Sequence, residues 1–384
     1  MKICLITSTR ADFGLLKNLI SELLNNNLNY KLIACGTHFA KVYGKTFTEI
    51  QNSKIYIDKK IKIPLKKDNA QGIAFSMSQH LLRVANALNE LKPDLVIVLG
   101  DRYEILAATI SAYISRIPIA HIHGGEVTQG VLDDAFRHSI TKMSHIHFVA
   151  NKIYKNRVIQ LGESPKNIHV VGGLGVDSIK KVNFFSKETL EKKFKIKFKR
   201  KNLLINFHPE TIEKRKTILH IKELLAALKR LKDTLLIFTS PGADLENKII
   251  IKHIKTFVNN NSNAFFYKSL GQDNYYSFLN FIDGVIGNSS SGLLEVPAFK
   301  KATINIGNRQ AGRLLSKSVI NVSIKRAAIL KSIKKIYSHK FQKIIQKSNN
   351  PYGKFGASVK IVKIIKKLRF NNLFNKKFYD LKSK

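Results

Sequence analysis

Two short stretches of the sequence decide its fold class: Gly-Asp-Arg-Tyr-Glu at 100–104 and His-Ile-His-Gly-Gly-Glu at 121–126. Each follows a short apolar segment, and a helical stretch lies between the two. This order predicts strand, helix and strand, with the polar residues at the carboxyl ends of parallel strands, where an open α/β sheet forms its crevice. Acidic and imidazole side chains at such an edge indicate an enzyme.

The alternation of strand and helix extends over the whole chain in two halves. It runs to a glycine-rich joint at 172–175 and begins again near residue 203. Two such halves predict an α/β protein with two Rossmann-like, doubly wound domains that face each other across a cleft. We predict an N-terminal domain at 1–173, a C-terminal domain at 174–359, and a basic helix and tail at 360–384 that packs back on the N-terminal domain.

The composition is ordinary except for its charge. The 384 residues are 44% hydrophobic, and no apolar run is long enough to span a membrane. The two cysteines indicate neither a disulfide framework nor a thiolate metal site. With 66 basic and 26 acidic residues, the net charge is +40, but the lysines are scattered and no nucleic-acid motif is present. We therefore expect a cytoplasmic protein without nucleic-acid or membrane partners. The charge leaves one alternative open, a basic binding protein that would be retained on DNA in a salt-dependent way.

Loops that follow the predicted strands of the second half have the residue types of an anion site. Ser289, Ser290, Ser291 and Gly292 lead into a predicted helix, whose first N–H groups are free to bind an anion. Glu295, one turn into that helix, is placed to accept hydrogen bonds from sugar hydroxyls.

Further polar residues lie where they could reach the same anion. They are Arg10 after the first strand, His208 in the loop 208–211, and Arg309 and Arg313 after a later strand; a loop at 240–244 opens on the same edge. Together they suggest a nucleotide diphosphate held largely by the second domain.

The corresponding residues of the first half suggest proton transfer beside that diphosphate. They are Asp101, Arg102, His123, Glu126 and the pair Asp133 and Asp134. Clustered carboxylates shift one another's pKa values and can supply both an acid and a base. Structural roles stay open, because either Asp of the pair could cap a helix and Arg102 could be an internal ion-pair partner. The alternating histidines at 121 and 123, and at 145 and 147, predict strand packing plus one functional imidazole rather than a metal site.

Several motifs resemble the hydrolysing UDP-N-acetylglucosamine 2-epimerases of bacterial sialic acid biosynthesis. Besides the two stretches above, the motifs are Thr-Arg-Ala-Asp at 9–12, Arg-His-Ser-Ile-Thr-Lys-Met-Ser at 137–144, Phe-His-Pro-Glu-Thr at 207–211, Gly-Asn-Ser-Ser-Ser-Gly-Leu-Leu-Glu-Val-Pro at 287–297 and Ala-Thr-Ile-Asn-Ile-Gly-Asn-Arg-Gln-Ala-Gly-Arg at 302–313. The resemblance covers about residues 1–356. It implies a GT-B fold with a UDP-sugar in the cleft, no metal or other cofactor, and a homodimer or tetramer.

The implied reaction is an elimination followed by a hydration. A base removes the proton on carbon 2 while UDP leaves, and water then adds to the acetamidoglucal with the opposite configuration at carbon 2. The products are N-acetylmannosamine and UDP.

The resemblance also assigns residues to roles. Asp101 and Asp133 match catalytic carboxylates, and Glu295 matches a ribose-binding carboxylate. Arg10, His208, Ser290 and Ser291 match diphosphate-binding positions, and His208 is a candidate proton donor to the departing phosphate. Other branches have a catalytic glutamate at the position of His123; either His123 or Glu126 takes that role here.

We predict catalytic roles for Asp101, His123, Glu126, Asp133 and His208. Substrate binding is predicted for Arg10, Arg102, Asp134, Ser289, Ser290, Ser291, Gly292, Glu295, Arg309 and Arg313. The first alternative is the same reaction on UDP- or GDP-linked N,N'-diacetylbacillosamine, on the path to legionaminic acid. Those relatives tend to have Glu where this chain has His123, which favours N-acetylglucosamine. A GT-B glycosyltransferase is a more remote alternative.

Overall fold

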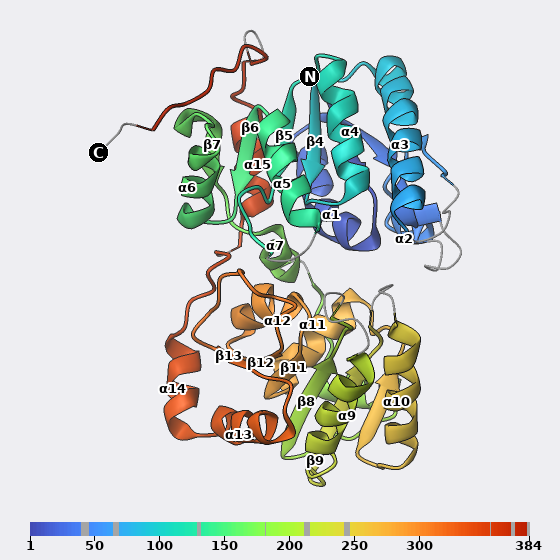
Figure 1. The fold of residues 1–384 in the computed structure, drawn as a ribbon, viewed down its shortest axis with the longest axis vertical. Coiled ribbons are helices and arrows are strands. Elements are labelled where there is room, and N and C mark those ends of the chain that lie inside the picture. The colour runs from blue at the N-terminus through green and yellow to red at the C-terminus, as the bar shows by residue number, and fades with distance from the viewer. Residues whose placement is uncertain are drawn as a thin grey trace. The chain divides into compact units, whose positions relative to one another are not determined.

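The chain forms two compact units. The structure, a computed structural model, describes residues 1–39, 46–63, 69–128, 132–180, 182–210, 216–241, 246–353, 355–369 and 373–381 (Figure 1). Unit 1 comprises Met1–Ser178 and Tyr352–Lys384, and unit 2 comprises Ile179–Pro351. These limits lie several residues from the predicted domain limits at 173/174 and 359/360.

Unit 1 is built on a sheet in which the paired strands are all parallel, in the order β3-β2-β1-β4-β5-β6-β7. The strands are β1 (Lys2–Thr7), β2 (Asn29–Ala34), β3 (Lys59–Lys60), β4 (Leu95–Leu99), β5 (Ile119–Ile122), β6 (Ile146–Val149) and β7 (Ile168–Val170). The strand order reverses between β1 and β4. The loops that follow these two strands therefore open at the switch point where α/β sheets bind ligands.

Helices cover the sheet of unit 1. They are α1 (Arg10–Asn25), α2 (Phe47–Asn52), α3 (Ala70–Leu91), α4 (Tyr103–Ile114), α5 (Leu132–Met143), α6 (Lys152–Gln160), α7 (Leu174–Lys180) and α15 (Ala357–Ile365), with short 3-10 turns η1 (Gly36–Phe39) and η3 (Pro165–Asn167). No helix among the described residues is long and apolar enough to cross a membrane.

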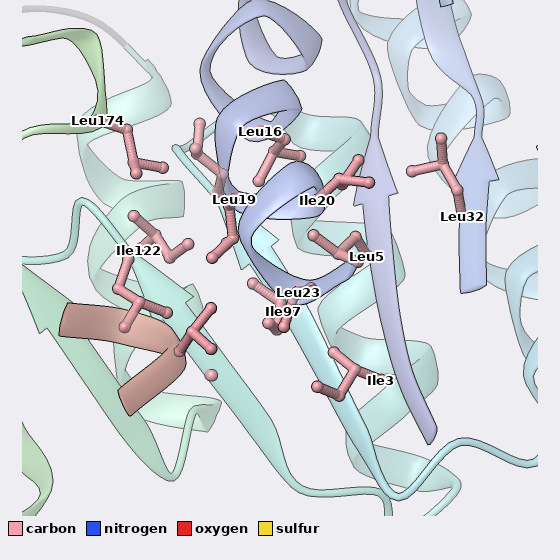
Figure 2. Close-up of a cluster of buried hydrophobic side chains, with 14 of the residues drawn as sticks. Ile3, Leu5, Leu16, Leu19, Ile20, Leu23, Leu32, Ile97, Ile122 and Leu174 are labelled. Atoms are coloured by element: carbon pink, nitrogen blue, oxygen red, sulfur yellow. The ribbon is translucent and has the colours of Figure 1, made fainter. Parts of the chain in front are cut away.

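The largest core of unit 1 lies between α1, α15 and one face of the sheet. Figure 2 shows side chains of α1, such as Leu16 and Ile20, beside Leu5 of β1 and Ile97 of β4. These side chains are fully buried. Replacing one such leucine or isoleucine by alanine typically costs about 2–5 kcal/mol of stability. The apolar residues at helical spacing along α1 thus hold this helix against the sheet.

The C-terminal segment returns to unit 1. Asp177 of α7 accepts hydrogen bonds from the N–H groups of Ala357 and Ser358, at 3.1 and 2.7 Å, and so caps α15. Further on, Lys376 Nζ lies 2.8 Å from Glu163 Oε2, and the Phe374 ring packs on His145 with 4.9 Å between the ring centroids. Helix α15 and the tail from 373 to 381 therefore belong to the packing of unit 1.

Unit 2 repeats the design with a parallel sheet in the order β10-β9-β8-β11-β12-β13. The strands are β8 (Lys201–Asn206), β9 (Thr234–Thr239), β10 (Ala264–Tyr267), β11 (Gly284–Gly287), β12 (Ala302–Ile306) and β13 (Val319–Val322). The helices are α8 (Lys187–Phe194), α9 (Thr217–Leu228), α10 (Asn247–Asn259), α11 (Gln272–Phe281), α12 (Ser291–Leu294), α13 (Arg326–Ile336) and α14 (His339–Lys347), with the 3-10 turn η4 (Val296–Phe299). Its switch point lies between β8 and β11.

Candidate active site

Asp101 and His123 follow neighbouring strands of unit 1. Leu99 of β4 pairs with Ile122 of β5, and the Gly100 N–H continues the ladder with a 3.2 Å hydrogen bond to the Ile122 carbonyl. Because parallel strands in register end at the same edge, the two residues lie close together there. The sequence placed both groups at this edge.

His123 has a backbone conformation that is uncommon for a residue with a side chain. Its φ is 69°, and its N–H donates to the Phe148 carbonyl at 3.0 Å. Nδ1 lies 2.8 Å from Glu126 Oε1, and Nε2 accepts a hydrogen bond from the Leu174 N–H at 3.4 Å. The ring is thus oriented with Nε2 toward the Leu174 N–H and Nδ1 toward Glu126. Strained residues of this kind concentrate at functional sites.

Arg137 connects the acidic residues of this edge. Its guanidinium, 3% exposed, is paired with Asp101 and lies 3.0 Å from Asp134 Oδ1. It also donates to the Glu126 carbonyl at 2.9 Å and to Thr128 Oγ1 at 3.3 Å. One buried cation thus fixes the side chain of Asp101 and the backbone beside Glu126. The sequence reasoning did not assign Arg137 a role.

Asp133 and Asp134 have different surroundings. Asp134 accepts from the Thr128 N–H at 2.7 Å and from Arg137, so it fixes the backbone at Thr128. Asp133 faces Arg102 and Glu104: burial raises its pKa, and the nearby Arg102 opposes the shift. Burial thus favours the protonated form of the Asp133 carboxyl, and its catalytic role stays a prediction.

Arg102 is an ion-pair partner inside unit 1. Its Nε and Nη2 atoms donate to the two oxygens of the buried Glu104, at 3.0 and 3.1 Å. The sequence left open whether Arg102 binds substrate or pairs internally, and this bidentate pair is the internal alternative. Substrate binding by Arg102 stays a prediction.

The other histidines of the sheet are structural. His121 is buried, with Nε2 2.9 Å from the Gly100 carbonyl oxygen and Nδ1 3.0 Å from Thr141 Oγ1, and burial lowers its pKa to about 3. His147 pairs with Glu163 at 3.1 Å. The described residues contain no group of three or more His, Cys, Asp or Glu side chains that could hold a metal ion. His121 thus fixes the loop that carries Asp101.

Arg10 begins α1 at the same sheet edge. Thr9 and Asp12 form a capping box at this helix start, which directs the chain away from β1. The Arg10 Nε atom lies 3.4 Å from Glu49 Oε2, and half of its side chain is exposed. Its predicted contact with a diphosphate stays a prediction.

The serine loop of unit 2 follows β11. The Tyr275 and Ser291 hydroxyls lie 2.8 Å apart, and those of Ser289 and Ser291 lie 3.4 Å apart. The Ser290 side chain makes no capping bond. Gly292 is needed because a Cβ there would press on Thr303 of β12.

The helix predicted from Ser291 is shorter than expected. Helix α12 ends at Leu294, and the turn η4 continues from Val296. Pro297 is the physical reason, because proline has no N–H to continue the helical ladder. Glu295 is therefore the residue between two short turns, rather than one turn inside a long helix. A four-residue helix has only a small dipole, so the N-terminal anion argument loses weight.

Glu295 is nevertheless an unusual carboxyl group. Burial raises its pKa to about 7, and a hydrogen bond with Tyr276 partly opposes the shift. At neutral pH the group is therefore divided between its neutral and its ionised form.

Two buried polar residues that the sequence reasoning did not select shape the rest of this edge. Glu210 accepts from the Asn308 N–H at 2.8 Å and fixes the loop that carries Arg309. Asn288 bonds to the backbone of His208, at 2.7 and 2.9 Å, and accepts from Arg309 Nη1 at 3.2 Å.

Three further parts of the predicted site differ in how far the structure describes them. Arg313 is half-buried in the loop beyond Arg309. Of the loop at 240–244, Ser240 and Pro241 are described, whereas positions 242–244 lie outside the described residues. Thr211 likewise lies outside them.

The sequence is similar to known proteins over its whole length. Residues 22–366 match the family model described as UDP-N-acetylglucosamine 2-epimerase. A GDP/UDP-N,N'-diacetylbacillosamine 2-epimerase (hydrolyzing) from Campylobacter jejuni is 39% identical, with 99% of each chain covered. Polysialic acid biosynthesis protein P7 from Escherichia coli is 37% identical over 99% of this chain and 97% of its own. A UDP-N-acetylglucosamine 2-epimerase from Neisseria meningitidis serogroup B is 31% identical, with 88% of each chain covered.

Solved structures show the same fold at lower identity. S. aureus MnaA, in a co-structure with UDP, has a TM-score of 0.78 at 17% identity, with 99% of each chain covered. The Neisseria meningitidis UDP-GlcNAc 2-epimerase bound to UDP-GlcNAc has a TM-score of 0.74 at 20% identity, covering 96% of this chain and all of that one. The predicted α/β, GT-B class with two Rossmann-like units is confirmed. The chain belongs to the UDP-N-acetylglucosamine 2-epimerase family.

Proposed function

We propose that the protein is a hydrolysing 2-epimerase that converts UDP-N-acetylglucosamine and water to N-acetylmannosamine and UDP. The observation that carries the proposal is the pair of His123 and Glu126, 2.8 Å apart, beside Asp101 at the edge of the sheet of unit 1. Family membership supplies the reaction type, and the arrangement of these three residues supplies the proton-transfer groups.

In this proposal His123 is the base that takes the proton from carbon 2. The Nδ1 side of the ring lies 2.8 Å from Glu126, and Nε2 becomes available to the substrate once the substrate displaces the long 3.4 Å contact with the Leu174 N–H. The electron pair of the carbon–hydrogen bond forms the double bond of the glucal, and UDP leaves with the electrons of the carbon 1–oxygen bond. Water then adds its hydroxyl to carbon 1 and a proton to carbon 2.

The carboxylates and unit 2 have the remaining roles. In the proposed reaction Asp101 and Asp133 exchange protons with the sugar and the attacking water; the ion pair of Asp101 with Arg137 and the raised pKa of the buried Asp133 support these roles. In unit 2, His208 and the serine loop take the diphosphate, and Glu295 accepts from the ribose hydroxyls. His208 supplies a proton to the departing phosphate.

The same reaction on N,N'-diacetylbacillosamine linked to UDP or GDP is the second candidate. One observation favours it: the Campylobacter relative of that name is 39% identical, against 31% for the Neisseria relative named for N-acetylglucosamine. Both candidates react at carbons 1 and 2, and their sugars differ only in the groups at carbons 4 and 6.

The experiment is turnover of each nucleotide sugar by the purified full-length protein, with products separated by chromatography and identified by mass. We expect the wild-type protein to release N-acetylmannosamine and UDP from UDP-N-acetylglucosamine. His123→Ala should lose this activity, and the control His339→Ala, at an exposed position, should retain it. Consumption of the diacetamido sugar alone would select the second candidate. Turnover of neither sugar would refute both.

A further inference from the structure

Asn288 lies at the switch point of unit 2, directly after β11. It is fully buried, and its amide makes two bonds to one residue of the neighbouring segment. Oδ1 accepts from the His208 N–H at 2.7 Å, and Nδ2 donates to the His208 carbonyl at 2.9 Å. A side-chain amide that engages both backbone groups of one residue fixes the orientation of that residue.

This contact extends the ladder between β8 and β11. The last paired residues are Asn206 and Gly287, and the Asn288 N–H still donates to the Asn206 carbonyl at 3.2 Å. Beyond that point the two backbones separate into loops. The Asn288 side chain then takes the place of a further peptide group, so His208 is held in line with the sheet.

The carbonyl of Asn288 binds a third segment. It accepts from Arg309 Nη1 at 3.2 Å and from Gln310 Nε2 at 3.0 Å, both in the loop after β12. One residue therefore connects the loop after β8, the serine loop after β11 and the arginine loop after β12. All three carry residues predicted to bind the diphosphate.

The His208 ring is oriented by a second asparagine. Its Nε2 atom lies 2.9 Å from Asn206 Oδ1, and an amide oxygen accepts only, which places a proton on Nε2. Both the backbone and the ring of His208 are therefore fixed by side-chain amides at the end of this sheet.

We propose that Asn288 is a positioning residue for the reaction, one that places His208 and Arg309 on the diphosphate of the substrate. The inference rests on the proposed function, since it takes His208 and Arg309 as groups that bind the leaving nucleotide. Misplacement of a catalytic group by about 1 Å can cost roughly 100-fold in rate, so a hub of this kind has a measurable effect.

The chain contains a matched control at the other end of β8. Asn202 is also buried, and its amide makes the same two bonds to one backbone residue: Oδ1 accepts from the Lys199 N–H at 2.9 Å, and Nδ2 donates to the Lys199 carbonyl at 2.8 Å. It lies at the amino end of the strand, away from the switch point. A purely structural role would give both asparagines the same consequences.

The experiment is a double-mutant cycle with the full-length protein. We compare kcat, KM and the dissociation constant of UDP for four variants, and circular dichroism checks that each is folded. The variants are Asn288→Ala, Asn202→Ala, His208→Ala and the double variant Asn288→Ala with His208→Ala. We expect Asn288→Ala to lower kcat/KM by roughly 100-fold and Asn202→Ala by less than about threefold. In the His208→Ala background, Asn288→Ala should cost less than about tenfold, because residues that act as a unit are not additive.

Two outcomes separate the two proposals. Suppose first that the wild-type protein is active. If Asn288→Ala then has the same kcat/KM as Asn202→Ala, or lowers kcat/KM by the same factor with and without His208, the positioning role is wrong while the proposed function stands. If wild-type protein turns over neither nucleotide sugar, the proposed function fails first, and the positioning role fails with it.

Discussion

Glu295 gives a prediction in which the magnitude follows from the structure. Its pKa is about 7 because burial disfavours the charged form. We expect the ionised carboxylate to accept hydrogen bonds from the ribose hydroxyls of UDP, so binding requires loss of the proton. At about pH 6 only a tenth of the sites are ionised, and at about pH 8 nine tenths are. The dissociation constant of UDP should therefore fall by roughly ninefold between these pH values.

Two variants isolate this effect from the titration of UDP, whose phosphate also ionises near pH 6. The affinity of Glu295→Gln for UDP should depend on pH only through the ionisation of UDP itself. Subtracting the curve of this variant from the wild-type curve therefore leaves the contribution of Glu295. Tyr276→Phe deletes a hydrogen bond that holds the pKa of Glu295 down, so the midpoint should move to higher pH. Glu188→Gln, exposed on α8, is the control and should match wild type.

Isothermal titration calorimetry from about pH 5.5 to 8.5 at constant ionic strength measures these curves. Parallel curves for wild type and Glu295→Gln would refute the reasoning. In that case either Glu295 is not near the ribose or its proton is not linked to UDP binding.

Three further predictions concern stability and positioning. Arg137→Ala should cost about 1–3 kcal/mol in urea unfolding, since the half-buried carboxylates of Asp101 and Asp134 lose their common cation, and added guanidinium should restore part of the activity; unchanged stability would contradict this role of Arg137. Hydrogen bonds from His147, Lys376 and Lys142 lower the pKa of Glu163 to about 2, although burial opposes this shift. The stability that Glu163 contributes should therefore be lost as the pH falls from about 4.5 to 2. Glu163→Gln should remove this part of the pH dependence of unfolding, and an unchanged pH dependence would contradict the prediction. Gly287→Ala should prevent folding, because the new Cβ would overlap a backbone carbonyl of β8. The control Gly14→Ala should fold normally, because no atom lies near the position of its Cβ. If circular dichroism shows both variants to be well folded, the packing at β11 is wrong.

The sequence was sufficient to predict the architecture because buried parallel strands have continuous apolar runs. Segments such as 95–99 and 235–238 are of this kind, and polar residues follow each of them. The order of loops along the chain then placed Asp101 and His123 on one edge. The end of unit 2 was not predicted: β13 is a half-buried strand of four residues, and α13 and α14 have buried apolar residues at helical spacing that the interpretation of the sequence did not use.

The residues that organise the site could not be selected from one sequence. Arg137 reaches Asp101 across 36 positions, Asn288 reaches His208 across 80, and the Asn308 N–H reaches Glu210 across 98. No periodicity reports contacts between residues so far apart. A polar residue within an otherwise apolar helix face or at a strand end is the only local signal, and many surface residues share it.

At one point of unit 2, two local sequence features predict different lengths for the same helix. The serines at 289–291 predicted a helix start, but Pro297 limits α12 to a single turn. The proline was visible in the sequence. Its position six residues after Ser291 was the indication that Glu295 would lie at the end of a turn.

The most direct test of the central claim is proton NMR of the protein with UDP-N-acetylglucosamine in deuterated water. Elimination by a base at carbon 2 followed by hydration requires that the new hydrogen on carbon 2 comes from solvent. We predict free UDP and N-acetylmannosamine that is fully deuterated at carbon 2. Release of N-acetylmannosamine that keeps its original hydrogen there, or release of UDP with N-acetylglucosamine, would contradict the account.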